Sequence, residues 1–431
     1  MGKKFKMKYI LETYGCQMNV AESNALELQL KGVGLEKTEN GEEADVAILN
    51  TCSVRKSAES RIWGRLSYFA HIKKSRKLLL IVTGCMAERL KEDLKKEAPF
   101  VDLVIGTNEK IEIVNYITGD TVQEEDKYSF LTSYYKEGDF SSYVPIINGC
   151  NNFCSYCIVP YVRGREIMRE VDDILAEIDY LDKKGVQEVT LLGQNVNSYN
   201  FNGINFPKLL TLICQHCNNI KWIRFESPHP KDFSDELIEV IAKEEKVAKH
   251  IHLPMQSGNT RILKLMNRKN TRESFITLVE KMRAQIKEVS FATDVMVGFP
   301  SETEEEYGDT LSLMEIMKPI EAFMYYYNVR EGTPAEKMEE QIDEKVKTKR
   351  LERLIDEELK RVAIIKEEKL PFTANFIVTG IPRDDKDSYL ARSEHNEMVS
   401  FVPKQVHNVG DFVKVECTLL KGNTYKGEER L

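Results

Sequence analysis

Three cysteines of this chain stand close enough together to hold a metal cluster. Cys150, Cys154 and Cys157 form a C-x3-C-x2-C loop in the segment NGCNNFCSYC. Thiolates are soft ligands that suit iron–sulfur clusters or zinc. Three of them can hold three irons of a 4Fe–4S cluster and leave the fourth iron open to a chelating ligand. A structural zinc site would need a fourth Cys or His nearby, and none follows within the usual few residues.

A second set of three cysteines is dispersed along the first part of the chain. Cys16, Cys52 and Cys85 each follow a run that predicts a parallel strand, in TYGC, LNTC and VTGC. Successive β-α units are about as long as these intervals, and the carboxyl ends of parallel strands share one edge of a sheet. We therefore expect the three thiols to converge. The alternative is three unrelated buried thiols, because free cysteine is often a core residue.

The elements that would position these cysteines alternate between strand and helix. The β-like runs KYILET, DVAILN, LLLIVTG and DLVIGT are separated by helical patterns over 19–32, 55–72 and 86–97. This alternation predicts a doubly wound parallel sheet. From Tyr143 onward, further β-α units predict a partial (β/α) barrel with ligands at the carboxyl ends of its strands.

A charged helix over 344–368 leads to the last part of the chain, where strand-like runs are separated by Gly and Asn turns. That pattern predicts a small β-barrel. The expected fold class is therefore α/β, with domains at 6–122, 136–366 and 369–431. A polar, acidic stretch over 118–139 is expected to link the first two.

Composition excludes several other classes of protein. The chain has 431 residues, 42% of them hydrophobic and 30% charged, with a net charge of −8. That charge argues against nucleic-acid binding through overall charge, but not against a local basic face. The longest apolar run, Leu78–Val82, is too short for a membrane helix, and the basic N-terminus lacks a signal peptide's apolar segment. We expect a cytoplasmic protein with no membrane partner, whose cysteines serve metal or redox chemistry.

The cysteine motifs resemble those of a known family. The loop at Cys150, including Tyr156 before its third cysteine, resembles the signature of radical S-adenosylmethionine (SAM) enzymes. The strings TYGCQMN, NTCSVRKSAE and GCMAER resemble the N-terminal domain of methylthiotransferases, and the last β piece is similar to a TRAM domain, a small RNA-binding barrel. TYGCQMN and CSYCIVPYVRGRE resemble the tRNA branch, the MiaB-type enzymes. The ribosomal-protein branch typically has Pro-Lys where Gln17 and Met18 stand.

The resemblance implies an enzyme that replaces C–H with C–SCH3 at carbon 2 of N-6-dimethylallyladenosine, position 37 of tRNA. It implies two 4Fe–4S clusters and two SAM molecules, one as methyl donor and one as source of a 5′-deoxyadenosyl radical. The Cys150, Cys154 and Cys157 cluster would cleave SAM, and the Cys16, Cys52 and Cys85 cluster would carry the sulfur. The implied partners are the tRNA anticodon stem-loop, an electron donor such as a flavodoxin or ferredoxin, and the iron–sulfur assembly machinery.

Three other activities stay open. They are methylthiolation of threonylcarbamoyl-adenosine in tRNA, methylthiolation of an aspartate in a ribosomal protein, and RNA binding by a non-catalytic zinc protein.

The resemblance also implies residues that contact SAM. They are Gly193, Gln194 and Asn195 in LLGQN, and Gln256 and Ser257 in HLPMQSG. Arg268 and Lys269 are candidate phosphate contacts.

The remaining cysteines are expected to pack rather than to bind metal. KLLTLIC has helical spacing, and the pair Cys214 and Cys217 has no second CxxC to complete a zinc site. Cys417 alternates with Val413 and Val415 on a predicted strand, which indicates a small core residue.

Overall fold

The structure is a computed structural model that describes residues 7–53, 56–110, 112–119, 130, 135–136, 138–383 and 385–430. Most of the linker expected at 118–139 lies outside these residues, as do positions 6, 122 and 431, where domain limits were expected. No helix in the described part of the chain is long and apolar enough to cross a membrane.

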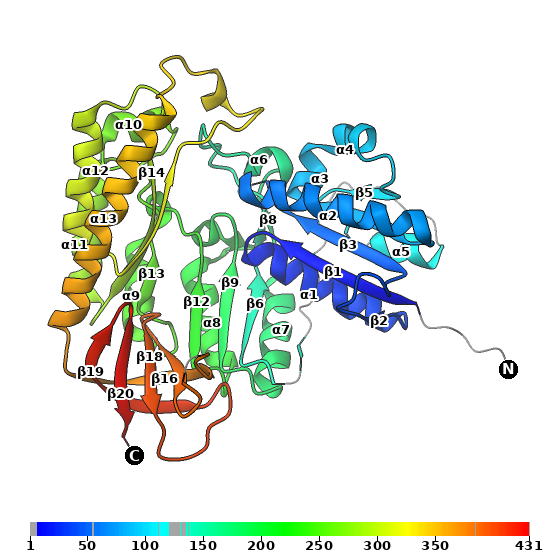
Figure 1. The fold of residues 1–431 in the computed structure, drawn as a ribbon. Helices are drawn as coiled ribbons and strands as arrows, with labels where there is room; N and C mark the ends of the chain where they lie inside the picture. Colours follow the sequence, from blue (N-terminus) through cyan, green and yellow to red (C-terminus); the bar gives the residue numbers. More distant parts are fainter. Residues whose placement is uncertain are drawn as a thin grey trace.

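The N-terminal part is a five-stranded, all-parallel sheet in the order β2-β1-β3-β4-β5 (Figure 1). Its strands are β1 (Lys8–Tyr14), β2 (Glu36–Lys37), β3 (Val46–Thr51), β4 (Leu79–Gly84) and β5 (Leu103–Ile105). Its helices are α1 (Gln17–Gly32), α2 (Lys56–Ser75), α3 (Cys85–Arg89), α4 (Lys91–Glu97) and α5 (Glu112–Thr118). α1 and α5 pack on one face and α2, α3 and α4 on the other, so the doubly wound sheet is confirmed.

One helix of this part differs from its prediction. The pattern over 86–97 predicts a single helix, but the chain breaks at Leu90, which has φ −104° and ψ 20°. The break lets the first piece, α3, begin at Cys85 itself and lie against the end of β4, while α4 packs Leu94 into the core.

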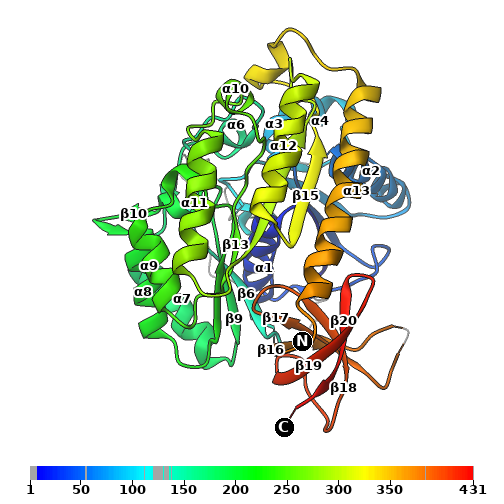
Figure 2. The ribbon, with the colours of Figure 1, turned by 90° about the vertical axis from the view of Figure 1, so that its left-hand side faces the viewer.

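The central part is a partial barrel of six parallel strands in two adjoining sheets, β12-β9-β6 and β13-β14-β15 (Figures 1 and 2). The strands are β6 (Ser141–Pro145), β9 (Glu188–Leu192), β12 (Trp222–Phe225), β13 (His250–His252), β14 (Ser290–Val297) and β15 (Glu321–Tyr326). Their covering helices are α7 (Val171–Lys183), α8 (Phe206–His216), α9 (Asp235–Lys243), α11 (Arg272–Gln285), α12 (Glu304–Met317) and α13 (Glu344–Glu368). The largest hydrophobic core lies between these strands and helices.

Several short elements lie in the connections that follow β6, β9 and β13. They are β7 (Ile147–Asn148), α6 (Val159–Val162), β8 (Ile167–Met168), β10 (Asn200–Phe201), β11 (Ile204–Asn205) and α10 (Thr260–Leu265). In Figure 1, α6 and α10 lie at the end of the barrel farthest from the C-terminal part, and α6 faces the N-terminal sheet.

The C-terminal part is a closed five-stranded barrel, as predicted. Its strands are β16 (Phe372–Gly380), β17 (Tyr389–Ser393), β18 (Met398–Val402), β19 (Phe412–Lys421) and β20 (Thr424–Glu429). β20 was not predicted, and its parallel pairing with β18 closes the barrel. Cys417 is fully buried in the core of this barrel, as expected.

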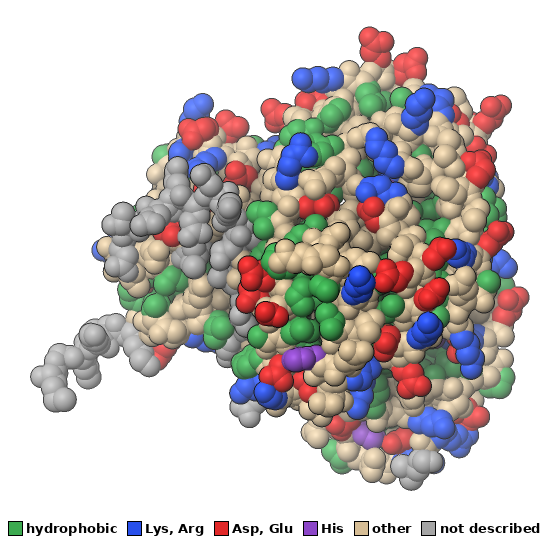
Figure 3. Space-filling model, turned by 180° about the vertical axis from the view of Figure 1, so that it is seen from behind, with side chains coloured by type: hydrophobic (Ala, Val, Ile, Leu, Met, Phe, Trp, Pro, Cys, Tyr) green, Lys and Arg blue, Asp and Glu red, His purple; other side chains and the backbone are tan. Residues whose placement is uncertain are grey.

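The C-terminal barrel closes the amino-terminal end of the central strands. Arg392 forms an ion pair at 2.6 Å with Glu188, the first residue of β9, and Asn396 donates to Glu321, the first residue of β15, at 2.8 Å. Arg224 of β12 donates to the carbonyl of Glu394 at 2.8 Å. At the opposite end of the central part, α6 packs against α3 of the N-terminal part (Figure 1). On the rear face of the molecule, Lys and Arg side chains lie among Asp and Glu side chains (Figure 3).

Candidate active site

The dispersed cysteines lie at the carboxyl edge of the N-terminal sheet, where the strand order changes direction between β1 and β3. Ligands of open α/β sheets bind at such switch points. The sheet register pairs Tyr14 with Thr51 and Thr51 with Gly84. Cys52 and Cys85 directly follow two of these neighbours, and Cys16 follows the third after one glycine. The register therefore places all three cysteines on adjacent strand ends.

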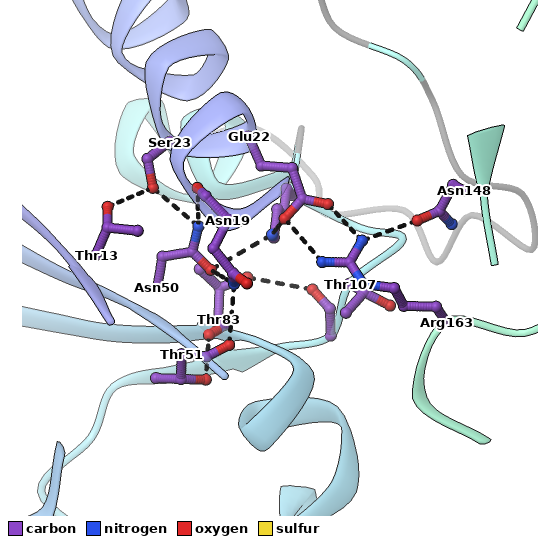
Figure 4. Close-up of polar contacts among 12 residues, drawn as sticks. Thr13, Asn19, Glu22, Ser23, Asn50, Thr51, Thr83, Thr107, Asn148 and Arg163 are labelled. Atoms are coloured by element: carbon purple, nitrogen blue, oxygen red, sulfur yellow. Dashed lines mark hydrogen bonds and ion pairs between the residues drawn. The ribbon is translucent and has the colours of Figure 1, made fainter. Parts of the chain in front are cut away.

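Asn19 ties two of these strand ends together (Figure 4). Its side-chain amide donates to the carbonyl of Thr51 at 3.1 Å, and its Oδ1 lies 3.2 Å from Cys16 Sγ. Gly84 makes the third loop possible. Its φ is +97°, and a Cβ atom there would lie 2.3 Å from the carbonyl oxygen of Thr51. Only glycine permits this approach without moving the backbone.

The long loop that connects the paired strands β7 and β8 contains Cys150, Cys154 and Cys157. Gly149 opens it with φ +85°, where a Cβ would lie 2.2 Å from the carbonyl oxygen of Arg165. The Cys150 amide donates to the carbonyl of Gly164 at 3.1 Å. The loop is anchored to the end of α10, since Ser155 donates through its amide to Met266 at 3.0 Å and through its hydroxyl to Leu265 at 2.8 Å.

Arg268 contacts Tyr156 of this loop, and the sequence analysis did not predict this contact. Its guanidinium is buried and donates to the carbonyl of Pro254 at 2.9 Å and to the Tyr156 hydroxyl at 3.4 Å. The expectation that Arg268 contacts phosphate is therefore wrong, because its donors face the interior of the protein. Lys269 is exposed, and its ammonium donates to Asn267 Oδ1 at 2.9 Å.

The two cysteine sets lie next to each other across the domain boundary. Cys85 packs in one hydrophobic cluster with Ile158 and Val162, which follow Cys157. Cys16 and Tyr143 of β6 both pack against a cluster that includes Leu192, the last residue of β9. The carboxyl edge of the sheet thus faces the carboxyl end of the barrel, with both sets of thiols at the junction.

The predicted SAM residues stand at the same end of the barrel. Gln194 Oε1 accepts from the amide of Gly149 at 2.6 Å, which brings the β9 loop against the residue before Cys150. Asn195 donates to Asp232 at 2.8 Å, while its Oδ1 is buried and has no hydrogen-bond partner among the described residues. Gly193 is buried beside these two residues.

Gln256 and Ser257 follow β13. Gln256 has a positive φ of 61° and bridges in parallel to Val295 of β14, an arrangement in which its side chain remains partly exposed. Ser257 is fully buried, and its hydroxyl accepts from the amide of Asn259 at 3.3 Å. Of this pair, only Gln256 has a side chain that reaches solvent.

The thiols differ in how readily they ionise, which matters because the thiolate is the form that binds iron. A hydrogen bond with Cys52 outweighs burial and, with the charge of Arg163, lowers the pKa of Cys16 to about 6. Burial raises the pKa of Cys85, that of Cys150 to about 11 and that of Cys157 to about 12. Cluster binding at these three thiols must therefore release protons.

The residues present fit iron–sulfur clusters with SAM. Each site offers three soft thiols and too few hard ligands for a different metal chemistry. The buried, unpaired Asn195 Oδ1 lies on the loop that contacts the residue before Cys150, and it suits a donor such as the amino group of SAM. Within the described ranges, no three His, Cys, Asp or Glu side chains are already grouped as a metal site.

The barrel interior contains a charged cluster that the sequence analysis missed. His252 of β13 lies between Glu226 at 3.0 Å and Asp294 at 2.8 Å. Although burial opposes its charge, hydrogen bonds to Asp294 and Glu226 prevail and raise the pKa of His252 to about 10. The Tyr325 hydroxyl donates to Asp294 at 3.3 Å, and the ring of Phe323 meets His252 edge-on at 5.9 Å. The available sequence signal for this cluster was the alternation of residues along each strand. The residues between the cluster members pack on the helices, so the cluster members face the barrel interior.

The cysteine pair outside both sets is part of the central core. Cys214 on α8 and Cys217 just after it are buried, and Lys246 lies over them, its ammonium 2.9 Å from the carbonyl of Cys214 and 3.8 Å from Cys217 Sγ.

Comparison with known proteins agrees with this geometry. Residues 8–106 match the uncharacterized protein family UPF0004, and residues 144–314 match the radical SAM superfamily. The tRNA-2-methylthio-N(6)-dimethylallyladenosine synthase of Treponema denticola is 43% identical, with 97% of this chain and 99% of that protein aligned. The enzyme of the same name from Bacteroides fragilis is 42% identical, with 98% of this chain and 95% of that protein aligned.

Solved structures share the fold at low sequence identity. The radical SAM methyltransferase TsrM from Kitasatospora setae superposes with a TM-score of 0.56 at 13% identity, covering 77% of each chain. The cobalamin-dependent radical SAM enzyme OxsB gives 0.53 at 12% identity, covering 82% of this chain and 56% of that one. The resemblance noted in the sequence is thus confirmed, and the chain belongs to the tRNA-2-methylthio-N(6)-dimethylallyladenosine synthase family of radical SAM enzymes.

Proposed function

We propose that this protein is a radical SAM methylthiotransferase that replaces the hydrogen on carbon 2 of N-6-dimethylallyladenosine at position 37 of tRNA with a methylthio group. One observation carries the proposal. Two sets of three thiols meet at the junction of the sheet and the barrel, in a chain 41–43% identical over nearly its full length to synthases of that name.

In this proposal the two sets have separate roles. Bound 4Fe–4S clusters and SAM supply the one-electron chemistry and the sulfur and methyl groups that an inert aromatic C–H bond requires. Cys150, Cys154 and Cys157 hold the cluster that binds SAM, and the Cys16 set holds the second cluster.

The SAM contacts are proposed from the loops that reach the first cluster. Gln194 is fixed by the amide of Gly149, and Asn195 offers its unpaired oxygen. Gly193 lets the loop pass closely. Gln256 completes the contact from β13 through its side chain, while Ser257, which is fully buried, supports the turn behind it.

The barrel interior suits the substrate base. Phe323 and Tyr325 on β15 are 38% and 36% exposed, which is unusual for large aromatic rings and favourable for stacking a splayed-out base. Both ring nitrogens of His252 are taken by Glu226 and Asp294, so a base stacked here would meet the carboxylate oxygens of this cluster, which can accept a hydrogen bond from an exocyclic N–H.

The three parts of the chain are proposed to divide the work. Residues 6–122 carry the sulfur-bearing cluster, residues 136–366 the SAM chemistry, and residues 369–431 a TRAM-like contact with tRNA outside the anticodon. We propose that the enzyme works in the cytoplasm, where tRNA is found, on the anticodon stem-loop. A flavodoxin or ferredoxin would donate electrons, and the iron–sulfur assembly machinery would load the clusters.

The experiment that tests the substrate compares three candidates in parallel. Anaerobically reconstituted protein is incubated with SAM, a reductant and either tRNA carrying dimethylallyladenosine, tRNA carrying threonylcarbamoyl-adenosine, or the ribosomal protein. Mass spectrometry should find the methylthio group only on the first. A product on either of the other two would contradict the substrate assignment while keeping the enzyme class.

Metal analysis separates the remaining alternative. The proposal expects about eight irons and eight labile sulfides per chain after reconstitution, from two clusters. Zinc without labile sulfide would instead establish a non-catalytic RNA-binding protein.

A further inference from the structure

A buried ion cluster joins the two domains (Figure 4). Glu22 on α1 accepts hydrogen bonds from Arg163 Nη1 at 2.7 Å and Nη2 at 3.3 Å, and it forms an ion pair with Lys110. The three side chains are 5%, 3% and 4% exposed, respectively. Glu22 follows Cys16 in the sequence, and Arg163 follows Cys157, so the ion pair links the two cysteine loops directly.

This cluster contains more positive than negative charge, because two cations share one carboxylate. Among the described residues, the other side-chain hydrogen bonds of the two cations go to neutral amides, with Asn148 Oδ1 at 2.8 Å from Arg163 and Asn50 Oδ1 at 3.4 Å from Lys110. Surplus buried charge is unfavourable unless an anion lies nearby. Three thiolates on a 4Fe–4S cluster form such an anion.

Both ends of the cluster are tied to the cysteine loops by neutral hydrogen bonds. Asn50, two residues before Cys52, accepts at 3.0 Å from Asn19, whose Oδ1 contacts Cys16 Sγ. On the other side, Asn148 stands two residues before Cys150. A movement of Arg163 would therefore displace both loops.

A second contact crosses the boundary at the same place. The Thr107 hydroxyl donates to the carbonyl of Val162 at 2.8 Å, directly before Arg163. The backbone next to Arg163 thus contacts the sheet domain as well, so the side-chain contact with Glu22 acts at a point where the two domains already meet.

We propose that Arg163 is a positioning residue for both thiol sets: its two-pronged contact with Glu22 fixes the distance between the clusters, and its charge stabilises the reduced cluster at Cys16, Cys52 and Cys85. The inference rests on the proposed function, since it takes these thiols as cluster ligands. Its two parts are separable. Lysine keeps the charge but lacks the planar fork, whereas methionine keeps the length and removes both.

The test uses redox titration of the Cys16 cluster, followed by electron paramagnetic resonance. A Cys150→Ala, Cys154→Ala, Cys157→Ala background leaves that cluster as the sole signal. Arg163→Met should shift its midpoint potential to a more negative value, because adding an electron without the cation is less favourable. Arg163→Lys should keep the potential close to that of the parent.

Arg169→Met is the matched control. Arg169 is also a buried arginine of the central domain, ion-paired with Glu177 of α7, so its loss carries a similar folding cost. The control should leave the potential unchanged. A potential in Arg163→Met equal to that of Arg169→Met would overturn the electrostatic part of the proposal.

The positional part is tested with both clusters present. Arg163→Lys should alter the spin–spin interaction between the two reduced clusters, because a single ammonium cannot reproduce the paired contacts to Glu22. A spectrum identical to that of the wild type would overturn the positioning role. If Arg163→Met fails to assemble its cluster, this measurement alone decides.

The measurements distinguish failure of this inference from failure of the proposed function. Formation of the methylthio nucleoside by the wild type, together with unchanged spectra and potential in the Arg163 variants, overturns this inference only. A lowered potential in Arg163→Met without any methylthio product from the wild type overturns the proposed function only.

Discussion

Replacing Glu22 with glutamine removes the carboxylate that Arg163 and Lys110 share in the interior of the protein. Burial opposes the charge of Glu22, but the two cations prevail and lower its pKa from 4.5 to about 2. Each unit of change in pKa corresponds to about 1.4 kcal/mol, so ionisation of Glu22 contributes about 3 kcal/mol to the free energy of unfolding. Removing one partner of a buried ion pair typically costs about 3–5 kcal/mol, which is consistent with this magnitude.

The free energy of unfolding of the N-terminal domain measures this loss. The chain has two tryptophans, Trp63 on α2 and Trp222 on β12. In a Trp222→Phe background, urea unfolding followed by fluorescence reports on Trp63 and therefore on the sheet domain. Glu22→Gln should lower the free energy of unfolding at pH 7 by about 3 kcal/mol.

Glu43→Gln is the control in the same domain. Glu43 pairs with Lys8 at 2.7 Å, and its side chain is 52% exposed, so solvent screens the pair and its loss should lower the free energy of unfolding far less than the loss of Glu22. If Glu22→Gln costs no more than this control, the reasoning about the buried cluster is wrong.

The pH dependence gives a second check with a definite sign. Because the folded pKa of Glu22 is lowered, its contribution is fully present above the unfolded value of about 4.5 and is lost as the pH falls toward about 2. The difference between wild type and Glu22→Gln should therefore shrink below about pH 4.5. A difference that stays constant down to pH 3 would contradict the assignment.

Three further predictions follow from other residues. Gly84→Ala, which would place a Cβ 2.3 Å from a backbone oxygen at φ +97°, should halve the iron bound on reconstitution; full iron content would show that the Cys85 loop adapts. Cys214→Ala with Cys217→Ala should leave the iron content unchanged, since these thiols pack in the core; loss of about half the iron would identify them as ligands. Because the folded pKa of His252 is raised to about 10, its stabilisation should be fully present below about pH 6.5 and disappear as the pH rises through 10; comparing the pH dependence of urea unfolding with that of His252→Gln measures this.

Much of the fold could be predicted because its signals are local. α13 begins and ends where its sequence pattern indicates, since Asp343 caps its first turn and the helix presents apolar positions at helical spacing. The two-residue strands β2, β7 and β8 could not be predicted, because a pair of residues has no periodicity. Their pairing is imposed by the neighbouring strand.

The candidate site likewise has features that could be predicted from the sequence and features that could not. The three dispersed cysteines were predicted to converge because β-α units of regular length bring strand ends to one edge. The pairing of Glu22 with Arg163 joins residues 141 positions apart and has no local signal. Arg268 was interpreted as a candidate phosphate contact; only the packing of the cysteine loop against it shows that it is buried.

The most direct test of the central account is a comparison of the two thiol sets in one assay. Wild-type protein, Cys16→Ala/Cys52→Ala/Cys85→Ala and Cys150→Ala/Cys154→Ala/Cys157→Ala are reconstituted anaerobically and given SAM, reductant and tRNA carrying dimethylallyladenosine. Only the wild type should yield the methylthio nucleoside by mass spectrometry. The first variant should still release 5′-deoxyadenosine, and the second should not. Methylthio product from either variant, or 5′-deoxyadenosine from the second, would contradict the division of roles between the two sets.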